Sequence, residues 1–170
     1  MAARSRAFVL DTNCFIDASR TDAGAEAFAE FCARAAPSLY LSTVVAAELR
    51  AGAGNASERR SLDQRVLSPY VRRGRLVNPS ASAWEALGTT LARLVEDEGL
   101  ELRDVRKSFV LDILIAWSCR EVGAVLVSGN VKDLSRIANV FAFDFMAPYP
   151  SQESPCARRG SLRESAVRSS

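Results

Sequence analysis

The sequence predicts an α/β domain with a mainly parallel central sheet. Short apolar runs alternate with longer segments of helical periodicity, which is the pattern of strand–helix–strand units. Several of the short runs are apolar at every residue, as are strands that are covered on both faces of a parallel sheet. With 170 residues, 48% of them hydrophobic, the chain is long enough for one globular domain with a buried core.

Turn residues bound the short apolar runs that are expected to be strands. These strands lie at residues 7–10, 39–41, 76–77, 124–127 and 140–143. Helical spacing of apolar residues, capping residues, and glycine or proline stops indicate the helices between them. The helices are expected over residues 14–35, 42–50, 57–68, 81–98, 108–122 and 130–137.

Individual residues set the bounds of the helices in the first half of the chain. The first helix is expected to be interrupted near Asp22, which can cap a second segment. Ser42 or Thr43 caps the next helix, which glycines then stop. Ser57 opens a further helix, and Pro69 is expected to end it.

The second half of the chain follows the same logic. A long helix that carries apolar residues at helical spacing is stopped by Gly99. Ser108 is expected to cap the next helix and Gly123 to end it. Either Ser128 or Asn130 caps the last helix.

Composition limits the domain organisation and the location of the protein. Residues 1–150 are expected to form the domain, and the Ser- and Arg-rich residues 151–170 a disordered tail. No apolar run approaches the roughly 18 residues of a membrane span, and the apolar stretch near the N-terminus is too short for a signal peptide. A cytoplasmic protein with no membrane partner is therefore expected.

The cysteines are interpreted as buried or incidental thiols in a reducing compartment. No Cys-x-x-Cys spacing and no histidine are present to complete a zinc site, and a cysteine nucleophile would lack a histidine partner. The four thiols are those of Cys14, Cys32, Cys119 and Cys156.

Four acidic residues stand where the surrounding apolar sequence predicts burial, which is unfavourable without a compensating cation. They are Asp11, Glu48, Asp112 and Asp133. Asp11 and the turn at 128–133 each follow an apolar strand, and neighbouring parallel strands place such residues at one edge of the sheet. Because the chain has no histidine, four converging carboxylates indicate a hard divalent metal.

Each acid also has a purely structural explanation, and these explanations stay open at the level of sequence. Asp11 can cap the turn that follows it, and Asp112 can belong to a narrow polar helix face. Glu48 and Asp133 can be exposed helix residues. Asn130 is as good a helix cap as it is a metal ligand.

The order and spacing of these motifs resemble those of PIN-domain proteins, and within that group the VapC-type ribonuclease toxins of type II toxin–antitoxin pairs. The resemblance runs from about residue 7 to about residue 147 and rests on four segments: Val9–Asn13, Ser42–Leu49, Leu111–Ala116 and Leu126–Leu134. It implies a PIN-like α/β/α sandwich and a Mg²⁺- or Mn²⁺-dependent endoribonuclease. Ser128 stands where a threonine is more usual, and Leu134 where an aromatic residue commonly follows the acid.

The resemblance also implies roles for individual residues. Asp11, Glu48 and Asp112 match the three acids that hold metal, and Asp133 is favoured over Asn130 for the fourth acidic position. Together the four acids form the expected catalytic set, with Asp11, Asp112 and Asp133 as metal ligands. Four side chains are expected to support them: those of Thr12, Asn13, Ser128 and Asn130.

The residue types are consistent with that chemistry. Clustered carboxylates raise one another's pKa, and a bound Mg²⁺ removes the repulsion. A chain without histidine cannot cleave RNA through a pair of imidazoles, so a metal-activated water is the expected nucleophile. Glu48 or Asp112 can orient that water, and the products would carry a 5′-phosphate and a 3′-hydroxyl.

The expected partners are an RNA substrate, a cognate antitoxin and a second copy of the chain, the last two implied by the resemblance alone. Apolar surfaces around Trp84 and Phe28–Phe31 are candidates for the dimer contact, and both are equally candidates for core. A cluster of arginines is expected to bind RNA phosphates, although it can equally be a solvated helix face or meet an acidic partner. This arginine segment comprises Arg59, Arg60, Arg65, Arg72 and Arg73.

Three other functions fit parts of the pattern. A PIN-like module that has lost activity would still bind RNA or protein. A phosphatase with a nucleophilic Asp after the first strand usually has a second Asp two residues later, where this chain has Asn13. A DNA nuclease with the same site would act on the same phosphodiester linkage.

Overall fold

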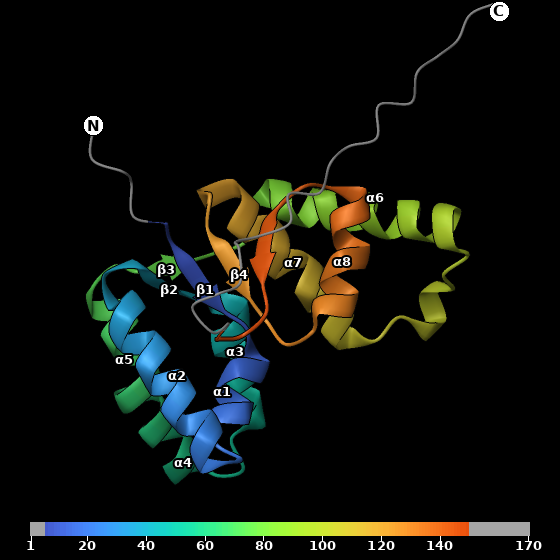
Figure 1. Cartoon of the computed structure of the whole chain (residues 1–170). Coiled ribbons are helices and arrows are strands. Elements are labelled where there is room, and N and C mark those ends of the chain that lie inside the picture. The colour runs from blue at the N-terminus through green and yellow to red at the C-terminus, as the bar shows by residue number, and fades with distance from the viewer. Residues whose placement is uncertain (1–5, 150–170) are drawn as a thin grey trace, which may run out of the picture.

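The structure of the protein is a computed structural model, and residues 6–149 are described. Its centre is a five-stranded sheet in which every paired strand is parallel and the order is β3-β2-β1-β4-β5 (Figure 1). The strands are β1 (Phe8–Leu10), β2 (Leu39–Ser42), β3 (Leu76–Val77), β4 (Val125–Val127) and β5 (Asp144–Met146).

Helices pack on both faces of this sheet, so the predicted α/β/α sandwich is confirmed. The α-helices are α1 (Thr12–Ala18), α2 (Asp22–Ala35), α3 (Thr43–Gly52), α4 (Ala56–Leu62), α5 (Ser68–Arg72), α6 (Ala81–Glu98), α7 (Lys107–Val122) and α8 (Val131–Val140). The shorter turns are the 3₁₀ helices η1 (Ala36–Ser38) and η3 (Leu102–Asp104) and the π-helical turn η2 (Asp63–Leu67).

The alternation of side chains along the central strands divides the core into two parts. Val9 pairs in register with Leu126, and both face the larger hydrophobic cluster, to which α3, α6, α7 and α8 contribute. Leu10 pairs with Val127, and both face the smaller cluster with Phe31 of α2. Because strand side chains point alternately to opposite faces, three-residue strands are enough to join both halves of the core.

The first half of the chain corrects three of the predicted helix bounds. Thr21, and not Asp22, caps α2, because its hydroxyl accepts the Gly24 N–H at 3.0 Å. Asn55 caps α4 two residues before Ser57, and its side-chain oxygen accepts two backbone N–H groups. Pro69 does not end a helix: it lies in the first turn of α5, where a proline has no hydrogen bond to lose.

The second half of the chain corrects two more predictions, one for a helix cap and one for a strand. Helix α7 begins at Lys107 with Arg106 in the capping position, so Ser108 lies within the first turn and caps nothing. Residues 140–143 are not a strand, because Val140 is the last residue of α8 and packs in the core with Ile137 of the same helix. The fifth strand is β5, which begins at Asp144 and pairs with β4.

Other expectations from the sequence meet the structure only in part. Cys14 and Cys119 are buried free thiols and Cys32 is half-buried, whereas Cys156 and the expected tail at 151–170 lie outside the described residues. Within residues 6–149, no helix has both the length and the apolar composition needed to cross a membrane.

Replacing Ile137 by alanine is expected to lower the free energy of unfolding by about 2–5 kcal/mol, because the side chain is fully buried between α8 and the sheet. Urea denaturation followed by circular dichroism measures the change. Lys132→Ala, at an exposed position of the same helix, should shift the stability by less than about 0.5 kcal/mol. Equal stabilities of the two variants would contradict the packing of α8.

Candidate acidic site at the carboxyl edge of the sheet

The pairing of β1 with β4 brings two polar turns to one edge of the sheet. The backbone N–H of Asp11 donates to the carbonyl of Val127 at 2.9 Å, and the N–H of Ser128 donates to Met146 at 3.0 Å. Asp11 and Ser128 therefore leave their strands side by side. This confirms that the two apolar strands are neighbours and that their following turns share the carboxyl edge, where sites form in parallel sheets.

Asp11 is 5% exposed, and its carboxylate accepts three hydrogen bonds from neutral donors. One oxygen accepts the backbone N–H of Thr12 at 2.7 Å. The other accepts the Asn13 amide at 2.7 Å and the Ser128 hydroxyl at 2.6 Å. Asp11 thus caps α1, and the same carboxylate belongs to the acidic cluster at this edge of the sheet.

The donors around Asp11 also bond to one another and to the next acid. The Asn13 amide reaches Ser128 Oγ at 2.9 Å, and its side-chain oxygen accepts the Gly129 N–H at 3.1 Å. The Thr12 hydroxyl donates to Glu48 Oε2 at 2.6 Å, which joins the start of α1 to α3. These bonds hold half-buried Glu48 beside Asp11.

The two remaining acids are bridged by one amide group. Asn130 Nδ2 donates to Asp112 Oδ2 and to Asp133 Oδ2, each at 2.9 Å. Asn130 occupies the capping position of α8 without capping it, because its side chain is engaged by these carboxylates. Its backbone N–H is held by Ser128 Oγ at 3.0 Å, which connects this pair to Asp11.

Asp133 differs from the other three acids because it is paired with cations. Arg106 donates to its Oδ2 at 2.7 Å, and Arg136 lies 3.7 Å from its Oδ1. Within residues 6–149, neither Asp11 nor Glu48 nor Asp112 has an ion pair. Negative charge without a cation is therefore concentrated on the side of the cluster formed by β1, α3 and α7.

Burial is the main cause that raises the pKa values of the three unpaired acids. Burial, followed by the charge of Asp11, raises the pKa of Asp112 to about 7. Burial also raises the pKa of Asp11, although its hydrogen bonds oppose the change, and the pKa of Glu48 rises through burial and the nearby Asp11. The charge of Asp11 thus raises the pKa values of both Glu48 and Asp112, which places these three carboxylates in one region.

The side chains as they stand do not form a ready coordination sphere. Within the described residues, no group of three or more acidic, histidine or cysteine side chains is placed to hold a metal ion. The Asn130 amide lies between Asp112 and Asp133, and arginine occupies Asp133. The donor set nevertheless suits a hard cation, because Asp11, Glu48 and Asp112 offer only carboxylate oxygens and carry charge that a cation would compensate.

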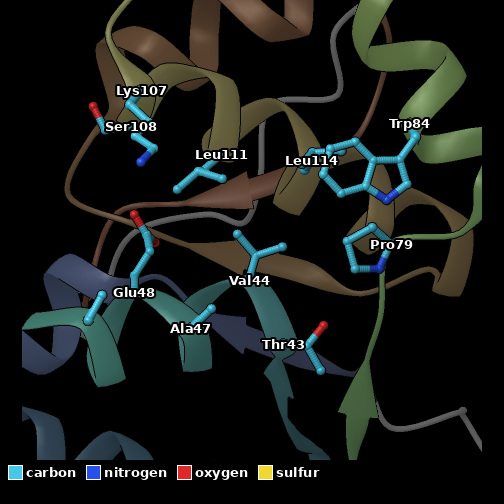
Figure 2. A pocket seen from close by; sticks show the side chains of 11 residues that line it. Thr43, Val44, Ala47, Glu48, Pro79, Trp84, Lys107, Ser108, Leu111 and Leu114 are labelled. Atoms are coloured by element: carbon cyan, nitrogen blue, oxygen red, sulfur yellow. The ribbon is translucent and has the colours of Figure 1, made fainter.

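A pocket of about 610 Å³ opens beside this cluster (Figure 2). Glu48 lies on its wall, and Lys107 and Ser108 stand above it at the start of α7. Pro79 and Trp84 lie at the other end, and the Trp84 side chain is 57% exposed. Trp84 is therefore a surface residue, whereas Phe31, on the other expected dimer surface, is buried in the core.

The cationic residues near the acids were not identified from the sequence. Arg106 and Lys107 flank the cluster, but no pattern in an arginine-rich chain distinguished Arg106 from its neighbours. The arginine segment is instead exposed on α4, η2 and the end of α5, beside α2 in Figure 1. Within residues 6–149, none of its members bonds to any of the four acids.

A parallel α/β/α sandwich with clustered acids after its central strands defines a PIN-like domain. The PIN domain family model matches residues 8–140, and the chain belongs to this family. Comparison with the curated proteins found no match.

Solved structures show the same fold at low sequence identity. A FitAB complex bound to an IR36 DNA fragment matches with a TM-score of 0.63 and 17% identity over 85% of this chain and 97% of that chain. DNA-bound VapBC from Salmonella typhimurium matches with a TM-score of 0.61 and 20% identity, over 84% of this chain and 98% of that chain. VapBC2 from Rickettsia felis, bound to a promoter DNA fragment, matches with a TM-score of 0.58 and 24% identity, over 82% of this chain and 97% of that chain.

Asp112→Asn is expected to stabilise the metal-free protein at about pH 8, by about 1–4 kcal/mol. Between the ordinary value of 3.8 and about 7, folded Asp112 keeps a proton that the unfolded chain has lost. The stability of the parent protein therefore falls as pH rises through this window and levels off above it. Asparagine cannot ionise, so the difference should vanish near pH 4. Urea denaturation in EDTA measures it, and equal stabilities at about pH 8 would contradict the raised pKa of the buried Asp112.

Proposed function

We propose that this protein is a metal-dependent endoribonuclease, the toxin of a toxin–antitoxin pair. The observation that carries the proposal is the cluster of Asp11, Glu48 and Asp112, three acids held together at the carboxyl edge of the sheet without a cation among the described residues. Such a cluster is unfavourable for folding alone, and a divalent cation with a phosphodiester substrate would explain its presence.

The metal, Mg²⁺ or Mn²⁺, would be held by Asp11 and Asp112, with Asp133 as the proposed third ligand and Glu48 completing the catalytic set. When bound, it would acidify a water and stabilise negative charge on the scissile phosphate. The unpaired carboxylates supply only oxygen ligands, which Mg²⁺ prefers. Ligation by Asp133 requires Arg106 to move from Oδ2 or the ion to use Oδ1.

The surrounding side chains would fix the acids in place. Ser128 and Asn13 orient one oxygen of Asp11, and the Thr12 hydroxyl orients Glu48. Glu48 lies on the wall of the open pocket and is the acid best placed to orient a water that enters from solvent. Asn130 can turn its amide so that its oxygen faces a cation, which would release Asp112.

The biological setting rests on the structural neighbours. These neighbours are VapBC and FitAB complexes, and the three reported above are bound to DNA. We infer that this chain likewise pairs with a cognate antitoxin, whose arginine could pair with the unpaired acids. A homodimer is proposed as well, with the exposed Trp84 and its apolar pocket as the contact surface. The exposed arginine segment is proposed to follow RNA phosphates.

The alternative is a PIN-like module that binds RNA or protein without cleaving it. The observation that favours it is that Asn130 and Arg106 already satisfy Asp133, so one acidic position is neutralised without a metal. Under this alternative, the protein would bind RNA and show no metal-dependent cleavage.

Asp11→Asn is expected to lower the rate of single-stranded RNA cleavage by more than about 100-fold, beyond the effect typical of residues that merely support metal ligands. The asparagine keeps the cap of α1, so circular dichroism should show an intact fold. Asp22→Asn makes the same chemical change at an exposed position and should cleave at the parental rate. Cleavage by Asp11→Asn at that rate would refute the assignment.

EDTA is expected to abolish cleavage by the parent protein, and added Mg²⁺ or Mn²⁺ to restore it. Sequencing of the cut ends should show a 5′-phosphate and a 3′-hydroxyl, because a water attacks and the ribose 2′-hydroxyl takes no part. Products that end in a 2′,3′-cyclic phosphate, or cleavage that persists in EDTA, would exclude the proposed chemistry.

A further inference from the structure

We propose that Arg106 binds a backbone phosphate of the RNA next to the cleavage site, with Asp133 holding its guanidinium in position. The inference rests on the proposed function and names a substrate-binding residue outside the acidic set. It gives Asp133 a second role beside the proposed metal contact, because Oδ2 holds the arginine while Oδ1 lies 3.7 Å from Arg136 and can face an ion.

Two observations about Arg106 carry the inference. Its side chain is 70% exposed, yet one nitrogen lies 2.7 Å from Asp133, whose own side chain is only 7% exposed. Within residues 6–149, the Arg106 side chain has no other hydrogen bond or ion pair. A guanidinium has five N–H donors, so four of them have no partner within the described residues, on a side chain that is largely exposed.

Asp133 does not depend on Arg106 for its hydrogen bonds. It also accepts the Asn130 amide at 2.9 Å and lies 3.7 Å from Arg136, whose guanidinium stacks over Phe109. The exposed arginine is thus an addition to a carboxylate that already has partners. A long side chain loses conformational freedom when it is held in this way, and that ordering prepares its free donors for a ligand.

The charge of the region indicates which ligand those donors fit. Three carboxylates without a cation repel the negatively charged RNA backbone. A bound metal would offset this repulsion only for the phosphate next to it, so the neighbouring phosphates need a cation of the protein. A planar guanidinium matches two oxygens of a phosphate, a geometry that a lysine does not provide. Lys107 follows directly and points across the pocket toward Glu48 (Figure 2). Arg106 and Lys107 therefore begin a cationic path along which a strand of phosphates can reach the acids.

The experiment measures binding of a short single-stranded RNA to the full-length Asp11→Asn protein, which prevents cleavage. Dissociation constants are determined over a series of salt concentrations for Arg106→Ala, Arg106→Lys and the matched control Arg103→Ala. Arg103 is a 78% exposed arginine of η3 that is paired with Glu101 and touches none of the four acids. A single-stranded DNA of the same sequence is measured in parallel.

Arg106→Ala should weaken RNA binding about tenfold and reduce the slope of log K against log salt by about 0.7, the value for one lost phosphate contact in a single strand. Arg106→Lys should restore the slope but only part of the affinity, because lysine keeps the positive charge but cannot bond two phosphate oxygens with a planar guanidinium. The loss should be equal for DNA, since the contact is to phosphate. A purely structural role for the ion pair would leave the slope unchanged.

The outcomes separate this inference from the proposed function. If Arg106→Ala binds RNA with the affinity and slope of Arg103→Ala, the phosphate contact is refuted, whether or not the parent protein cleaves RNA. If the parent protein binds RNA through Arg106 but does not cleave it with Mg²⁺ or Mn²⁺, the ribonuclease proposal fails and the contact stands. No binding of RNA by the parent protein overturns both.

Discussion

Asp11 is buried at the end of the central strand, where its carboxylate accepts hydrogen bonds only from neutral groups. The rest of the site depends on this arrangement. Its bonds fix the start of α1 and the turn after β4, and through Thr12 they place Glu48 of α3. Neutral donors stabilise the carboxylate without cancelling its charge, so the charge is still felt at Asp112. Parallel pairing of β1 with β4 is what brings these groups together.

Burial and charge repulsion raise the pKa of Asp112, which folding alone would not favour. An acid whose pKa is raised to about 7 destabilises the folded chain when it ionises near neutral pH. A core of this size can tolerate that penalty, because α7 packs eight of its residues into buried positions along the same helix. Charge that is retained against stability is characteristic of sites that bind a cation or carry out chemistry.

Local sequence predicted the layers and the grouping of the acids, and it failed where tertiary packing decides. The acids were visible because each interrupts an apolar run, and the shared edge followed from the strand that precedes Asp11. The strand expected at 140–143 was wrong because burial of Val140 extends α8, and apolar content does not distinguish a buried helix end from a strand. Pro69 was misread because the π-helical turn before it places proline in a first turn. Arg106 was invisible, since its significance lies in a contact 27 residues away along the chain.

The acidic cluster is therefore asymmetric, and the asymmetry has chemical consequences. Asp11, Glu48 and Asp112 have no cationic partner among the described residues, whereas Asp133 has two arginines within 4 Å. A cation entering from solvent gains most where charge is unpaired, and an anion gains most where a guanidinium still has free donors. Cleavage of a phosphodiester uses both kinds of site: a cation at the bond that breaks, and a guanidinium that holds the strand. Asn130 joins the two halves through a single amide, so movement of that side chain would alter both at once.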